Sequence, residues 1–168
     1  IISIIGILLF ISLISYSPED PNFIFSENTE INNFLGYQGS YISDLFLQSI
    51  GVISYLIPLT FLITGINIFK RKNIFLILEN TFFIVVYSII GSSFFNYYYI
   101  DAFELYINGN GGFVGNYLNQ TFLNDLIKIN DVFFYYILIF ITLIFFLISI
   151  NFHPIEFFSS IKKFLNFF

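Results

Sequence analysis

Three long apolar runs, each without a charged residue, constrain this chain more than any other feature of its sequence. They cover residues 50–69, 81–99 and 132–150. A helix of about 20 apolar residues crosses the hydrocarbon core of a bilayer, and it pairs its own backbone polar groups there. A shorter apolar run, 1–15, opens the sequence without a basic segment before it, so we interpret it as a truncated first span. The pattern predicts an all-α, polytopic membrane protein with four transmembrane helices.

Composition supports a single membrane domain over residues 1–168. Hydrophobic residues make up 57% of the chain and charged residues 10%, whereas soluble domains have roughly 45 to 50% and about 25%. The third span is expected to start at Thr81, because Glu79 and Asn80 suit the water boundary better than the bilayer centre. The remaining segments are predicted as outer loops at 16–49 and 100–131 and cytoplasmic segments at 70–80 and 151–168.

The cations set the predicted orientation. Lys70, Arg71 and Lys72 lie between the second and third spans, and Lys162 and Lys163 follow the fourth, so all but one of the six basic residues fall on one side. Cytoplasmic loops carry such an excess, which places both chain ends in the cytoplasm. Anionic lipid could also bind these cations, but their topological role already accounts for them. Tyrosines, which prefer the membrane interface, gather at the predicted outer ends: Tyr16, Tyr55, Tyr97, Tyr98, Tyr99, Tyr135 and Tyr136.

The two outer loops share a weak sequence repeat. Residues 36–42 and 112–118 both follow the order Gly, aromatic, any residue, Gly, small polar, Tyr, aliphatic. The match fits either a real duplication or chance in a composition rich in Phe, Tyr and Asn. Apolar residues recur at helical spacing after Gly39, after Gly115 and over 155–168. These patterns predict short interfacial helices in both outer loops and after the last span.

A set of landmark residues follows the first span, precedes and enters the second, and occupies the second outer loop: Ser15, Tyr16, Ser17, Pro18, Asp20, Pro21, Asn33, Gly36, Gly39, Asp44, Gly51, Pro58, Gly111, Gly112, Phe113, Val114 and Gly115. In identity and spacing these landmarks resemble the N-terminal four-span membrane domain of the FtsK/SpoIIIE DNA translocases. The resemblance covers nearly the whole chain, and the first loop is more specific than the second.

This resemblance implies a membrane anchor and assembly domain that acts in cell division and chromosome segregation at the septum of the bacterial inner membrane. It implies contacts with lipid, with other copies of the chain and with division proteins. The family's hexameric motor, which uses ATP and Mg²⁺ and touches DNA, is expected outside this sequence. These 168 residues hold no Gly-x-x-x-x-Gly-Lys-Ser/Thr phosphate loop. We therefore expect no enzyme activity and no cofactor in this segment.

The glycines and carboxylates of the two loops are the candidate contact residues. Gly36, Gly39, Gly111, Gly112 and Gly115 could form a recognition surface for division proteins, or could supply turns and close approaches, which we favour. Asp20 is expected in a turn beside Pro18 and Pro21, and Asp44 on a solvated face. Paired-carboxylate catalysis needs a water-limited cleft, for which the sequence gives no indication.

Small polar residues within the spans are candidates for helix packing. Thr60 with Thr64, and Ser88 with Ser92, form small faces that join either the four helices of one chain or neighbouring protomers. At the end of the last span, His153 before Pro154 is expected to close the helix rather than to sense pH.

A small transporter or channel subunit is the alternative function. The spans lack the charged residues that line such paths, so this function is disfavoured. A membrane enzyme is disfavoured as well, because no Cys is present and the one His lies on the inner side.

Overall fold

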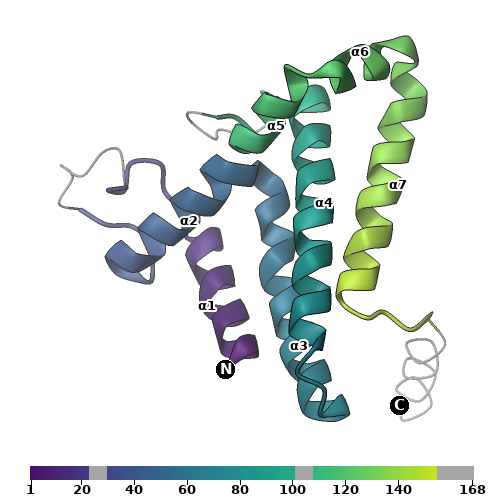
Figure 1. The fold of residues 1–168 in the computed structure, drawn as a ribbon. Coiled ribbons are helices and arrows are strands. Elements are labelled where there is room, and N and C mark those ends of the chain that lie inside the picture. Colours follow the sequence, from purple (N-terminus) through teal and green to yellow (C-terminus); the bar gives the residue numbers. More distant parts are fainter. Residues whose placement is uncertain (23–29, 101–107, 155–168) are drawn as a thin grey trace, which may run out of the picture.

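The computed structural model describes residues 1–22, 30–100 and 108–154. Every regular element in this part of the chain is a helix, which confirms the all-α prediction (Figure 1). The elements are α1 (Ile2–Ile14), α2 (Gly36–Ile50), the 3-10 helix η1 (Gly51–Tyr55), α3 (Leu56–Arg71), α4 (Leu76–Tyr98), α5 (Gly112–Asn119), α6 (Phe122–Ile129) and α7 (Asp131–Ser149). The helix predicted within 155–168, together with Lys162 and Lys163, lies outside the described residues.

Four apolar helices, α1, α3, α4 and α7, run in alternating directions through the molecule (Figure 1). The stretches 36–71, 76–98 and 131–149 are long and apolar enough to cross a membrane, and α1 is a shorter apolar helix. The N-terminus, the α3–α4 connection and the end of α7 lie at one end of this bundle. Helices α2, α5 and α6 lie at the opposite end. The arrangement is that of a four-span protein with its helical loops gathered on one side.

The second span is joined to α2 by a sharp bend. Gly51 has a φ of 71°, in the left-handed region that favours glycine. The backbone of Asn110 lies so close to it that any side chain at Gly51 would collide. The chain then turns through η1 into α3. As a result, α2 crosses the end of the bundle that holds the helical loops, while α3 runs through the bundle (Figure 1).

Helix α4 begins at Leu76, five residues before the predicted start of the membrane span at Thr81. Glu79 is exposed, but Asn80 is only 1% exposed. The Asn80 Nδ2 atom donates a hydrogen bond of 2.7 Å to Thr64 Oγ1 on α3. This bond offsets part of the cost of burying the amide, although Asn80 Oδ1 is buried without a hydrogen-bond partner among the described residues.

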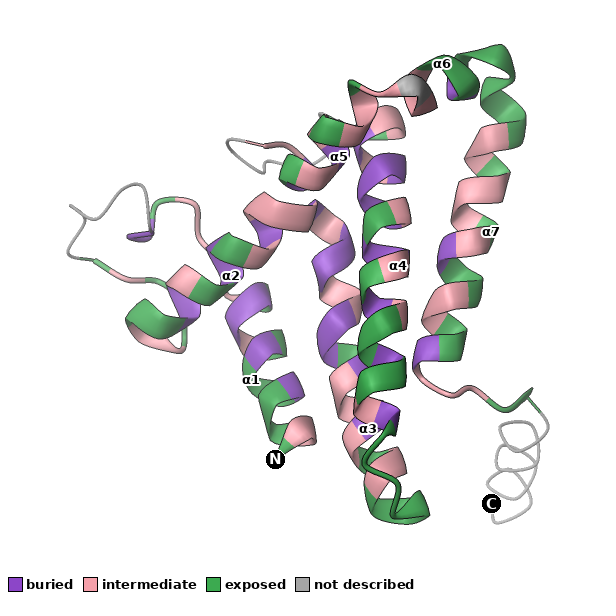
Figure 2. Cartoon of the chain, viewed as in Figure 1, coloured by how far each residue is buried: buried purple, intermediate pink, exposed green. Residues whose placement is uncertain are grey.

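The small residues of the spans pack the bundle itself. Gly6 lies against the backbone of Pro58, and Gly91 lies against the side chain of Ile53. Thr60 is fully buried and hydrogen-bonds Tyr87 Oη at 3.2 Å. Figure 2 shows that buried residues recur along α1, α3 and α4. Close contacts between small residues join helices in lipid, so these faces hold one chain together.

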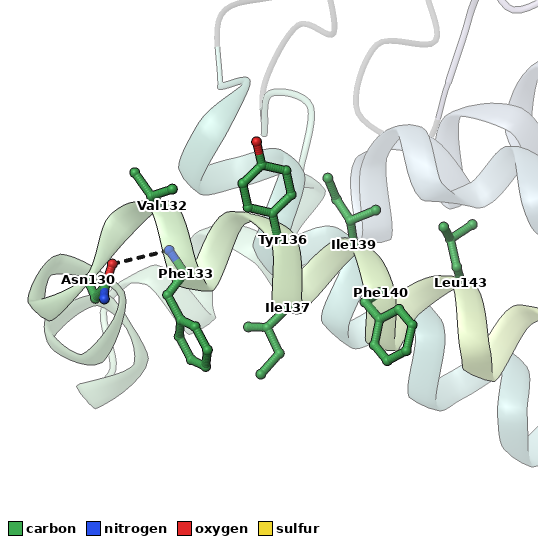
Figure 3. Close-up of a pocket in the computed structure, with 8 residues that line it drawn as sticks. All are labelled: Asn130, Val132, Phe133, Tyr136, Ile137, Ile139, Phe140 and Leu143. Carbon is green, nitrogen blue, oxygen red and sulfur yellow. Dashed lines mark hydrogen bonds between the residues drawn. The ribbon is translucent and has the colours of Figure 1, made fainter.

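The outward surface of α7 carries large apolar side chains. Figure 3 shows the residues that line a shallow apolar groove of about 730 Å³ on this helix. They form two rows along the helix: Val132, Tyr136, Ile139 and Leu143 in one, and Phe133, Ile137 and Phe140 in the other. Only 11% of the apolar window of α7 is buried within the chain. Such a face is expected to meet lipid acyl chains in the membrane.

Candidate functional site

Asp20 fixes the return of the chain from α1 to α2. Its carboxylate is 2% exposed, and its two oxygens accept backbone N–H groups from Asn32 and Asn33, each at 2.8 Å. Hydrogen bonds to an ionised acceptor are stronger than neutral ones. The neighbouring Pro21 is held through its carbonyl, which accepts Ser40 Oγ at 2.6 Å, and Pro18 lies half-buried beside them. The predicted turn at Asp20 therefore closes on the start of α2.

Asn33 connects this turn to the end of α1. Its Nδ2 atom donates to the Ser12 carbonyl at 2.8 Å, and Ser12 Oγ donates to the Gly39 carbonyl at 2.6 Å. Gly39 lies so close to the Asn33 amide and to Leu35 that a β-carbon would collide with both. The motif residues therefore hold α2 firmly across the end of α1.

The first glycine of each repeat adopts the same conformation. Gly36 and Gly112 both have a φ of 64°, and each begins a helix. The Gly36 N–H donates to the Asn33 carbonyl at 2.9 Å, and the Gly112 N–H donates to the Gly109 carbonyl at 3.2 Å. The two loops thus use the same tight turn to start α2 and α5.

The glycines of the second loop lie against α4 and against the bend before α3. A β-carbon at Gly111 or at Gly115 would stand 2.5 Å from the Ser92 carbonyl oxygen of α4. A β-carbon at Gly112 would stand 2.6 Å from the backbone nitrogens of Ile50 and Gly51. These three glycines let α5 lie directly on α4 and on the bend before α3.

Polar contacts join the two loops into one layer, here called the outer layer: residues 16–22, 30–52 and 108–119. The Asn108 N–H donates to Gln48 Oε1 at 3.3 Å, and Asn108 Nδ2 donates to the Gln48 carbonyl at 3.2 Å. The Val52 N–H donates to the Asn110 carbonyl at 2.9 Å. The candidate residues of both loops therefore belong to a single structural unit at the outer end of the bundle.

Asp44 lies inside this layer, and the prediction of a solvated face was wrong. The side chain is 6% exposed and accepts hydrogen bonds from Tyr16 Oη at 3.2 Å and Gln48 Nε2 at 3.4 Å. Burial raises the pKa of the Asp44 carboxyl, and the two hydrogen bonds oppose that rise. The sequence pattern of α2 does not reveal that Tyr16, in the segment after α1, lies against the Asp44 carboxylate.

The predicted topology residues lie at the other end of the molecule. Lys70, Arg71 and Lys72 are exposed at the end of α3. The Arg71 guanidinium and His153 Nε2 lie 2.6 Å apart, and because a guanidinium can only donate, the imidazole accepts. His153 does not close α7: the helix ends at Ser149, and Asn151 takes the left-handed φ of 50° that terminates it.

The chemistry of the outer layer is structural. Within the described residues, no group of three or more His, Cys, Asp or Glu side chains could hold a metal ion. The two buried carboxylates, Asp20 and Asp44, accept hydrogen bonds from groups that fix the loops. Sequence reasoning missed Ser12 and Ser40 as partners. A small polar residue inside an apolar run, as at Ser12, is the signal that would have found one of them.

The fold and this site define a polytopic membrane domain whose loop residues lock the outer ends of its helices. The family described as the 4TM region of DNA translocase FtsK/SpoIIIE matches residues 1–162. The chain belongs to this family, as its sequence predicted. It is the transmembrane part of an FtsK-family translocase.

Individual relatives agree with the family match. A DNA translocase FtsK of Rickettsia prowazekii is 30% identical over 99% of this chain and 22% of the relative. One of Rickettsia bellii is 40% identical over 43% of this chain and 10% of the relative, and one of Shewanella oneidensis is 30% identical over 71% and 14%. The chain thus spans a quarter or less of these relatives' length. No solved structure matches it.

Proposed function

We propose that this domain anchors a DNA translocase in the bacterial inner membrane and assembles its subunits at the division septum for chromosome segregation. The single observation that carries the proposal is the match of residues 1–162 to the four-span region of this family. The structure is compatible with it, because the motif residues Asp20, Gly39 and Gly112 serve helix packing. Hydrolysis of ATP with Mg²⁺ and contact with DNA are assigned to the motor outside this sequence.

The arrangement of the helices supports a motor on the cytoplasmic side. The N-terminus and the end of α7 lie at the same end of the bundle as Lys70, Arg71 and Lys72 (Figure 1). Basic residues favour the cytoplasmic face. The chain that leaves α7 then continues into the compartment that holds ATP and the chromosome.

The outer layer is the proposed contact for other division proteins. Four of its exposed aromatic side chains are Phe34 and Tyr37 beside and on α2, and Phe113 and Tyr117 on α5, with exposed fractions from 52% to 78%. Phe113 and Tyr117 stack with ring centroids 6.4 Å apart. Exposed aromatic side chains are the residues that most often anchor a protein interface.

Septal localisation tests the proposal directly. A fluorescent fusion to the full-length protein is expected to concentrate at the division site, and the double variant Phe113→Ser with Tyr117→Ser is expected to spread over the whole membrane at an unchanged level. The matched control is Phe133→Ser with Tyr136→Ser on the exposed face of α7, which leaves the outer layer intact. A wild-type fusion that is uniform in dividing cells would overturn the septal role.

The transporter alternative gains no support from the described spans. The buried hydroxyls of Thr60, Tyr87 and Ser149 bind one another, and Ser92 Oγ donates to the Ile50 carbonyl. A conduction path needs polar groups that are available to its cargo. Selective ion flux through the purified protein in liposomes would revive this function.

A further inference from the structure

A polar stripe follows one face of α3. Its members are Thr60, Thr64, Asn67 and Arg71, and residues three or four positions apart share a face of a helix. Thr60 and Thr64 are buried, Asn67 is half-buried and Arg71 is exposed. The stripe therefore leads from the interior of the bundle to its cytoplasmic end.

The buried half of the stripe meets the end of α7 in two places. Thr60 Oγ1 and Ser149 Oγ are hydrogen-bonded at 3.1 Å. Asn80 Nδ2 of α4 donates to Thr64 Oγ1 at 2.7 Å and to Asn151 Oδ1 at 3.3 Å. Asn80 thereby connects α4 to α3 and to the turn that follows α7 through a single amide.

The more exposed half of the stripe, Asn67 and Arg71, contacts the residues that follow α7. Asn67 Nδ2 donates to the Ile150 carbonyl at 3.2 Å, and Arg71 contacts His153. Successive stripe residues thus hold the short segment 149–153, in which the chain leaves α7.

The end of α7 is itself a closed turn. The Asn151 N–H donates to the Ile148 carbonyl at 2.8 Å, and the Phe152 N–H donates to the Leu147 carbonyl at 3.0 Å. With the left-handed Asn151, these bonds form a Schellman motif. The side chain of the left-handed residue is the one that Asn80 holds. The turn and the stripe therefore fix the position and the direction of the exit.

We propose that the polar stripe is a clamp that transfers load from the chain after α7 to α3 and α4. This inference rests on the proposed function, in which a motor follows this domain and pulls on it. Only Thr142 and Ser149 of α7 are buried within the chain, and its exposed apolar face is expected to meet lipid. Apolar contacts between helices give little net drive in a bilayer, so interhelical hydrogen bonds and close packing resist displacement.

Single-molecule pulling on the full-length protein in a bilayer tests the clamp. The protein is held by a C-terminal tag, and the lifetime of α7 in the membrane is measured at constant force after the motor has unfolded. Asn80→Leu removes two hydrogen bonds and fills the same space. We expect its lifetime to fall about sevenfold, the factor that two average interhelical hydrogen bonds in a membrane represent.

Two further variants separate the clamp from a general loss of stability. Asn67→Leu removes one bond at a half-buried position that tolerates an apolar side chain, and we expect a fall of about threefold. The control is Ser88→Ala on α4, because Ser88 Oγ is buried without a hydrogen-bond partner among the described residues. Its lifetime is expected to equal that of the wild type.

The direction of pulling gives the decisive comparison. Pulling from the N-terminal end loads α1 first, so Asn80→Leu and Asn67→Leu should leave the first step unchanged there. Wild-type lifetimes for both variants under C-terminal load would overturn the clamp, and so would equal losses in both directions. Failure of the proposed function is recognised separately, by a full-length fusion that does not concentrate at the septum.

Discussion

Alanine at Gly36 and at Gly112 distinguishes the need for a left-handed turn from the need for close packing. Both glycines have a φ of 64°, where a β-carbon costs about 1 kcal/mol or somewhat more. Among the described residues, no non-neighbouring atom lies within 4 Å of a β-carbon at Gly36, whereas one at Gly112 would stand 2.6 Å from two backbone nitrogens. Overpacking adds about 1 to 3 kcal/mol. We therefore expect a loss of about 1 kcal/mol for Gly36→Ala and about 2 to 4 kcal/mol for Gly112→Ala.

The assay is equilibrium unfolding of the purified protein in mixed detergent micelles, followed by far-UV circular dichroism as the fraction of dodecyl sulfate rises. Gly109→Ala is the matched control in the same loop as Gly112. Gly109 has a φ of 63°, and a β-carbon there would make only ordinary contacts with the described residues, the nearest at 3.4 Å, so its loss should match that of Gly36→Ala. Equal losses for Gly36→Ala and Gly112→Ala would refute the assignment of Gly112 to close packing.

The spans were predictable because apolar length alone determines them. The runs at 50–69 and 132–150 correspond to η1 with α3 and to α7 within a few residues. The start of α4 was not predictable, because it depends on a partner for Asn80 that lies on another helix. A single sequence shows the cost of a polar residue in lipid but not the group that offsets this cost.

The outer layer shows the same limit. The turn at Asp20 follows from local Asp and Pro preferences, but the burial of Asp44 depends on Tyr16 and Gln48, which the fold brings beside it. Helical spacing predicted a short helix in each outer loop, and α2 and α5 occupy those positions. Beyond their shared starting turn the halves differ, since α2 bends directly into the second span while α5 is followed by a separate α6.

Three further expectations follow from the contacts of the outer layer and from the topology. Asp20→Ala leaves two backbone N–H groups without their acceptor and should lower the unfolding free energy by about 3 kcal/mol. The control Glu30→Gln, at an exposed position, should lower it by less than about 0.5 kcal/mol. Equal unfolding midpoints for these two variants would contradict the role of Asp20. Asp44→Asn keeps an acceptor and avoids burial of a charge, so its thermal midpoint at pH 7 should equal or exceed that of the wild type. Folding raises the pKa of Asp44, so the folded state binds this proton more tightly than the unfolded state. The unfolding free energy of the wild type should therefore fall as pH rises through that pKa. The same dependence of unfolding free energy on pH in Asp44→Asn would count against this. With a membrane-impermeant thiol reagent, Lys72→Cys should react only from the cytoplasmic side and Phe113→Cys only from outside. Labelling of intact and of opened cells measures this, and the reverse pattern would contradict the predicted topology.

The most direct measurement of the anchoring and assembly role is a domain exchange in the full-length protein. Residues 1–168 are replaced by an unrelated four-span domain of the same topology, and chromosome segregation is scored in dividing cells. The proposed role predicts that DNA-stimulated ATP hydrolysis by the purified chimera stays near the wild-type rate while septal enrichment and segregation are lost. Normal septal enrichment and normal segregation by the chimera would contradict it.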